Sequence, residues 1–131
     1  MFNVWDRIEE NEFADIVTKA LESLFPGDPP RFLARTPHGY HDVATIERDL
    51  KRGGFSASPH VSTMAARSRA SSPRIPAIAY CQGTPLRNEI EARDKSRLGV
   101  ATDIAAEAIG QRFGRGSVEG GIQALVVAVE R

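Results

Sequence analysis

Short apolar runs and helically spaced apolar residues alternate along the chain. Continuous runs at 2–5 and 122–129 predict a buried strand near each end. Between 12 and 24, apolar side chains recur every three or four positions, which predicts an amphipathic helix. Asn11 is expected to cap this helix, and Pro26 and Gly27 to end it. The pattern therefore indicates a mixed α/β chain.

Four further helices are expected from capping residues and periodicity. Asp42 precedes a helix at 43–52, Ser72-Pro73 one at 75–82, Thr84-Pro85 one at 86–93, and Ser96 one at 97–113. Because Pro76 removes a backbone donor, a strand at 77–81 stays open as an alternative. The remaining segments are expected to be a proline-rich extended crossover at 25–40, an edge strand at 55–64 and a polar loop at 68–72.

Composition excludes several classes of protein. With 131 residues the chain is expected to form a single domain, 1–131. Seventeen basic residues balance seventeen acidic ones, so the charge that attracts nucleic acid is lacking and no nucleic-acid partner is expected. One cysteine, Cys81, allows no intrachain disulfide, and with no long apolar run we expect a cytoplasmic protein without a membrane partner.

Two segments invite a ligand interpretation that their spacing does not favour. The glycine-rich stretch at 114–121 follows a predicted helix and precedes a strand, the reverse of a phosphate-binding loop. We interpret it as a helix end and a turn. His38, His41 and Asp42, with His60, lack the spacing of a metal site, so no metal is expected. His38 facing a pocket as a proton acceptor, or as part of a structural loop, remains open.

Candidate ligand-binding residues come from two places. Trp5, Asp6 and Arg7 follow the first strand, and ligands of open α/β sheets bind beyond the carboxyl ends of strands. The densest polar and aromatic cluster is 80–88, where Arg87 could bind an anionic group and Cys81 is expected to be a buried, inert thiol. The candidates for substrate binding are Trp5, Asp6, Arg7, Phe32, His38, Tyr40, Tyr80 and Arg87. Catalytic residues cannot be assigned from these patterns.

Several segments together resemble the C-terminal half of class I S-adenosylmethionine-dependent methyltransferases of the ubiquinone/menaquinone-biosynthesis type. They are Phe2-Asn3-Val4-Trp5-Asp6, similar to the family's fifth strand; 46–55, similar to the helix and Gly-Gly-Phe turn before its sixth; Gly83-Thr84-Pro85-Leu86; and the terminal helix-glycine-strand unit. The likeness covers nearly the whole chain. Each motif is moderately specific, and their order and spacing are more so.

The resemblance implies a partial Rossmann-like methyltransferase sheet of about three strands, with the last strand antiparallel and central and helices packed on it. It also implies that the family's cofactor-binding half has no counterpart here, so that this chain alone binds no cofactor and is inactive in isolation. S-adenosylmethionine is the cofactor of the complete family. The segments that cover the substrate in such enzymes correspond to 5–8, 25–40 and 75–93.

Three functions follow as expectations. The first is a substrate-side half of a methyltransferase, for which the partner would be a separate cofactor-binding chain. The second is a non-enzymatic module that binds a small apolar or aromatic ligand near Trp5, Phe32, Tyr40 and Tyr80. The third is a dimerisation module, since the outer edge of a strand at Phe2–Trp5 would carry unpaired backbone groups that invite a homodimer.

Overall fold

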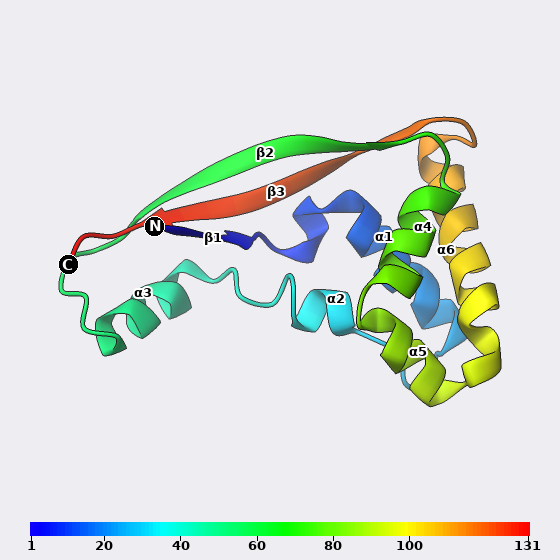
Figure 1. Ribbon diagram of the computed structural model, residues 1–131, viewed down its shortest axis with the longest axis horizontal. Coiled ribbons are helices and arrows are strands. Elements are labelled where there is room, and N and C mark those ends of the chain that lie inside the picture. Colours follow the sequence, from blue (N-terminus) through cyan, green and yellow to red (C-terminus); the bar gives the residue numbers. More distant parts are fainter.

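A computed structural model describes all 131 residues of the chain. It is a mixed α/β structure in which a three-stranded sheet extends from a cluster of helices (Figure 1). In chain order the elements are β1 (Phe2–Trp5), a 3-10 turn (Ile8–Glu10), α1 (Glu12–Leu24), α2 (Phe32–Arg35), α3 (Val43–Arg52), β2 (His60–Ala70), α4 (Arg74–Gly83), α5 (Leu86–Arg93), a 3-10 turn (Lys95–Arg97), α6 (Leu98–Phe113) and β3 (Val118–Ala128).

The sheet has the strand order β1-β3-β2, and both pairs of neighbours are antiparallel. The last strand is therefore antiparallel and central, as predicted. Val127 lies opposite Phe2 on one side and opposite Val61 on the other. β1 and β2 are both edge strands, which is the position that Pro59 predicted for β2.

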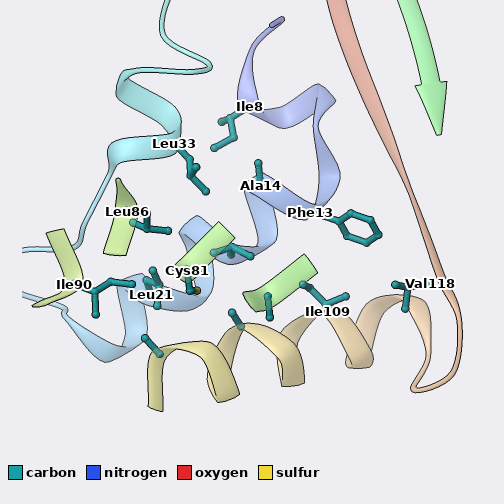
Figure 2. Close-up of a cluster of buried hydrophobic side chains, with 14 residues drawn as sticks. Ile8, Phe13, Ala14, Leu21, Leu33, Cys81, Leu86, Ile90, Ile109 and Val118 are labelled. Carbon is teal, nitrogen blue, oxygen red and sulfur yellow. The ribbon is translucent and has the colours of Figure 1, made fainter. Parts of the chain in front are cut away.

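The main hydrophobic core lies among the helices rather than against the middle of the sheet. α1, α2, α4, α5 and α6 turn their apolar side chains toward one another (Figure 2), with Val118 of β3 at the margin. On α1 the buried residues Phe13, Ala14, Val17 and Leu21 follow the predicted spacing of three and four. Cys81 is fully buried in this core, which confirms the predicted burial of its thiol.

A second, smaller buried layer lies at the other end of the sheet. Figure 1 shows α3 beside the two chain termini, away from the helical cluster. Ile46 is the buried residue of α3, and Leu125 and Val127 are the buried residues of β3 at that end. The predicted cap is present, since the Asp42 carboxylate accepts a hydrogen bond of 2.9 Å from the backbone N–H of Thr45.

β3 approaches the helical cluster closely at a glycine. A Cβ built on Gly120 would lie 3.1 Å from two ring carbons of Phe13. The Phe13 ring is in turn held edge-on against Phe113, with 5.3 Å between ring centroids. Gly120 thus serves the packing of the strand against α1.

Three predicted boundaries are wrong. The segment 25–40 is not wholly extended, because α2 forms within it and buries Leu33. The strand expected at 55–64 begins only after Pro59 and continues through the expected polar loop to Ala70. β2 is this long because it pairs with β3 along the whole length of β3, and Arg67 and Arg69 of β2 both form ion pairs with Glu119 of β3. The last strand also begins earlier than expected, at Val118.

Three predicted caps are wrong as well. The Asn11 side chain does not cap α1, because its amide bonds to the backbone of β3 and of the β1–α1 connection instead. Ser96 does not cap α6, since its hydroxyl donates to Asp94 over 2.6 Å. Ser72 makes no side-chain cap for α4. The 75–82 segment is nevertheless helical, because Pro76 lies in the first turn, where its missing donor would have no helical partner.

Candidate functional site

A pocket of about 240 Å³ lies where the end of β1 meets the helical cluster. It brings together three of the predicted candidates from three separate segments: Trp5, His38 and Tyr80. The pocket is lined by Trp5, Asn11, Leu33, Pro37, His38, Tyr80, Thr84 and Ile122. Its wall is therefore mostly apolar and aromatic, with a few polar atoms.

Trp5 forms the sheet side of the pocket. It is the last residue of β1 and pairs with Ala124, so its indole shares a sheet face with Ala124 and Met64. The indole remains 43% exposed. Its ring centroid lies 5.9 Å from that of His38, with the ring planes tilted by 46°. Trp5 is thus an accessible aromatic wall rather than a core residue.

His38 is held at the pocket by the turn that follows α2. Its backbone N–H donates to the carbonyl of Leu33 over 3.0 Å. The turn requires glycine at the next position, because a Cβ on Gly39 would lie 2.0 Å from the carbonyl oxygen of Arg35. The imidazole is only 6% exposed, so its orientation is fixed by packing.

The hydrogen bond of the His38 ring defines its tautomer. Nδ1 lies 3.0 Å from the backbone carbonyl oxygen of Asp6. A carbonyl oxygen can only accept, so Nδ1 carries the proton and Nε2 presents a lone pair. Burial lowers the pKa of His38, which favours this neutral form. Nε2 has no partner in the chain and is not sealed from solvent.

A polar network fixes the floor of the pocket. Asn11, 1% exposed, donates from Nδ2 to the carbonyl of Arg7 over 3.1 Å and accepts at Oδ1 from the backbone N–H of Gln123 over 3.1 Å. The Asp6 carboxylate accepts from Nε2 of Gln123 over 2.8 Å. The Asp6 carboxylate is therefore already hydrogen-bonded to β3. Asp6 contributes to the pocket through its backbone carbonyl, which lies against His38.

Tyr80 and Thr84 form the helical side. The Thr84 hydroxyl donates to the Tyr80 carbonyl over 2.7 Å and accepts from the backbone N–H of Leu86 over 3.2 Å, which confirms its predicted capping role. Burial raises the pKa of Tyr80, whose phenolic hydroxyl has no protein partner. That hydroxyl is available to a ligand as donor or acceptor.

The other candidates lie outside the pocket. Arg7 pairs with Glu10 over 2.9 Å, and Arg87 with Glu91 over 2.7 Å. The Tyr40 hydroxyl donates to Asp49 of α3 over 2.9 Å. Phe32 packs on the helical core. Five residues that line the pocket were not predicted as ligand contacts, because the sequence shows no more than a capping or core pattern at them. They are Asn11, Leu33, Pro37, Thr84 and Ile122.

The glycine-rich stretch does not have the geometry of a cofactor cradle. The backbone N–H of Gly121 donates to the Glu12 carboxylate over 2.8 Å, so an acidic side chain already lies where an anion would bind. The Phe13 ring fills the space beside Gly120. No three His, Cys, Asp or Glu side chains converge in a way that could hold a metal ion.

A second hollow, of about 420 Å³, opens on the sheet face beyond the helices and was not predicted. It is lined by Met1, Phe2, Asn3, Met64, Ala124 and Val126. Met64 is 60% exposed there. This surface, called the open sheet face below, is apolar and uncovered.

Comparison with models of known protein families finds no match to the chain, and a search of curated proteins finds none either. Among the six helices, none has both the length and the apolar character needed to cross a membrane.

Proposed function

We propose that the chain is the substrate-side part of an S-adenosylmethionine-dependent methyltransferase-like protein, and that the pocket between Trp5, His38 and Tyr80 receives its small aromatic ligand. The observation that carries this proposal is the convergence of those three side chains on one cavity. Ligand sites are typically concave and mostly apolar, with a few polar groups that set orientation.

The resemblance supports the assignment in a specific way. It expects three segments, 5–8, 25–40 and 75–93, to cover a substrate. Each contributes to this pocket: Trp5 from the first, His38 from the second and Tyr80 from the third. The sheet order β1-β3-β2, with an antiparallel central last strand, also agrees with the topology expected from the resemblance.

The size of the pocket limits the ligand. Pockets for drug-sized molecules span about 300–1,000 Å³. At about 240 Å³, this cavity suits a ligand with a single aromatic ring. Trp5 and Tyr80 offer aromatic faces, which favour stacked or edge-on contacts with such a ring.

We propose that the methyl donor binds to a separate cofactor-binding chain and not to this one. The residues of the glycine-rich stretch do not fit S-adenosylmethionine, because Glu12 and Phe13 already engage Gly121 and Gly120. The isolated chain is therefore expected to bind the aromatic ligand without transferring a methyl group.

Trp5, the only tryptophan of the chain, gives a direct assay. Phenol and toluene are titrated into the protein while indole emission is followed with excitation beyond the phenol band. At least one probe should change the emission saturably. Tyr80→Ala should weaken binding up to about tenfold, since an aromatic contact is worth about 0.5–1.5 kcal/mol. Tyr40→Ala, outside the pocket, is the matched control and should leave it unchanged.

If neither probe gives a saturable response, the ligand-binding proposal is contradicted. A separate titration with S-adenosylmethionine tests whether the isolated chain binds the cofactor. Micromolar binding of S-adenosylmethionine by the isolated chain would contradict the proposal that another chain holds the cofactor.

The free edge of β1 favours a second candidate function, a homodimerisation module. The backbone N–H of Asp6 bonds to Gln123 across the β1–β3 pair. Because bonding directions alternate along an antiparallel pair, the backbone groups of Asn3 and Trp5 point away from β3. A second copy of the chain, antiparallel across a two-fold axis, would pair with them and continue the open sheet face.

The dimer has its own test. Asn3→Pro removes the outward donor without touching a β1–β3 bond, so it should convert a dimer to a monomer in sedimentation velocity. Thr63→Pro, whose N–H faces outward at the opposite edge, is the matched control and should leave the dimer intact. A wild-type protein that sediments as a monomer, with rapid amide exchange at Asn3 and Trp5, would contradict this candidate.

A further inference from the structure

We propose that the outer edge of β2 binds an extended acidic segment of a protein partner, which adds to the sheet as a fourth strand and places carboxylates opposite Arg67 and Arg69. β2 lies on the other side of β3 from β1 (Figure 1). It contributes no residue to the pocket between Trp5, His38 and Tyr80, so this inference goes beyond the proposed function.

The first step is the direction of the backbone groups along β2. The backbone N–H of Asp6 donates to the carbonyl of Gln123, so the backbone groups of Gln123 point from β3 toward β1. Ala65 lies opposite Gln123 on the other side of β3, and its own N–H and C=O therefore point away from the sheet. The same direction recurs at every second residue, and no other backbone group of the chain bonds to these residues. They are Val61, Thr63, Ala65, Arg67 and Arg69.

The second step is that this edge is long and unprotected. β2 has 11 residues, against four in β1 and about 5–6 in an average strand. Edge strands are usually blocked by a proline, a lysine, a bulge or a covering segment. β2 contains no proline or lysine, and its register with β3 runs from His60 to Ala70 without a bulge. Its outer edge is therefore a regular series of free donors and acceptors, the surface to which an extended peptide adds as a strand.

The third step is the charge beside that edge. Nε of Arg67 and Nη2 of Arg69 lie 3.2 Å and 3.4 Å from the same carboxylate oxygen of Glu119. Two guanidinium groups thus share one carboxylate, and both arginine side chains are more than half exposed. Glu12 does not balance the remaining charge, because it is already paired with Arg112 over 3.1 Å. One positive charge is left over at this end of β2, which favours an acidic partner.

The fourth step is the sequence pattern that such a partner needs. Directly opposite residues of an antiparallel pair have Cβ atoms about 4.5–5.5 Å apart. Arg67 and Arg69 point to one face, so their partners are two acidic residues separated by one other residue. Met64 points to the opposite face, where it is 60% exposed, and an apolar partner side chain would pack beside it. Both strand pairs of the sheet are antiparallel. In that orientation the pattern is acidic, any, acidic, followed by alternating apolar residues.

A synthetic peptide of this pattern provides the probe. Acetyl-Asp-Ser-Glu-Val-Thr-Val-Thr-amide is titrated into the ¹⁵N-labelled full chain, and its neutral form with Asn and Gln in place of the acidic residues is the comparison. The amide resonances of Thr63, Ala65 and Arg67 should shift saturably, because their N–H groups gain acceptors. Those of Met64 and Ala66, which already face β3, should shift less. The acidic peptide should bind more tightly, by up to about fivefold per carboxylate.

Two pairs of variants separate the backbone contribution from the charge. Ala65→Pro removes an outward donor and no β2–β3 bond, so it should weaken binding of both peptides by about tenfold or more. Asn3→Pro makes the same change at the opposite edge of the sheet and should leave binding unchanged. Arg69→Gln should reduce the preference for the acidic peptide and leave the neutral peptide unaffected. Arg52→Gln, an exposed change on α3, is its matched control.

Several results would overturn the inference. Amide shifts at Asn3 and Trp5 in place of Thr63 and Ala65 would assign the peptide to the β1 edge. Equal affinity for the two peptides would overturn the role of the arginines. Shifts of the Thr63 and Ala65 amides with protein concentration alone would assign the edge to a second copy of the chain. The pattern of shifts in the wild-type protein decides the case even if Ala65→Pro is unstable.

Discussion

Gly120 lies where β3 crosses α1, and replacing it by alanine would place a methyl carbon 3.1 Å from Cε1 and Cζ of Phe13. Carbon atoms in contact prefer a separation of about 3.5–4.0 Å. The neighbouring Gly121 offers a matched comparison. A Cβ there would have ordinary contacts, at 3.5 Å from Arg67 and 3.8 Å from Glu12. Neither glycine has a positive φ, so backbone strain does not enter the comparison.

The magnitude depends on whether the Phe13 ring can yield. Phe13 is 2% exposed and packs edge-on against Phe113, so the ring has little room to move. Overpacking of this kind costs about 1–3 kcal/mol. Gly121→Ala should instead gain about 0.4–1 kcal/mol, because alanine restricts the unfolded chain. The two variants should differ by about 1.4–4 kcal/mol, a large part of a typical total stability of about 5–15 kcal/mol.

Urea unfolding followed by far-UV circular dichroism measures this difference. Gly120→Ala should lower the free energy of unfolding with an unchanged dependence on urea concentration, and Gly121→Ala should raise it slightly. If Gly120→Ala proves as stable as Gly121→Ala, the reasoning that the glycine-rich stretch serves packing against Phe13 is refuted.

Three further predictions follow from buried polar groups. Asn11→Ala should destabilise the fold by about 1–3 kcal/mol in urea unfolding, because it leaves the part-buried backbone N–H of Gln123 without its acceptor, and an unchanged midpoint would contradict that network. Burial raises the pKa of Cys81 to about 11, so a thiol reagent at neutral pH should label it no faster than the protein unfolds; rapid labelling of folded protein would contradict its burial. The pKa of His38 is lowered by burial, so the unfolded chain binds its proton first, and stability should fall as pH drops below about 6.5 and level off below the folded-state pKa. Wild type should therefore lose more stability than His38→Asn across this window in parallel urea titrations, and equal losses would argue against a neutral buried imidazole.

Local signals predicted the helices well. α1, α3 and α5 have the expected bounds, because periodicity, the Asp42 and Thr84 caps and the glycine and proline stops act within a few residues of each other. β2 was misplaced because its side chains are almost all exposed and leave no alternating pattern. The first and last residues of β2 are set by its pairing with β3. That pairing joins segments far apart in the sequence, so local patterns do not predict it.

The candidate site was predicted in part for the same reason. Trp5 and Tyr80 are aromatic residues beside local landmarks, the end of a strand and a capped helix. The relation between them depends on tertiary contacts, above all on the bond between His38 and the Asp6 carbonyl, 32 residues apart. Asn11 was interpreted as a cap because asparagine often has that role, and its contacts with Gln123 are equally long-range. The open sheet face, likewise, exists only once the strands are paired.

The most direct test is the position of bound phenol, measured by intermolecular nuclear Overhauser effects. Phenol ring protons should show contacts with the Trp5 indole, the His38 ring and the Tyr80 ring. Contacts confined to Met64, Ala124 and Val126 on the open sheet face, or an absence of contacts at saturating phenol, would contradict the assignment of the pocket as the ligand site.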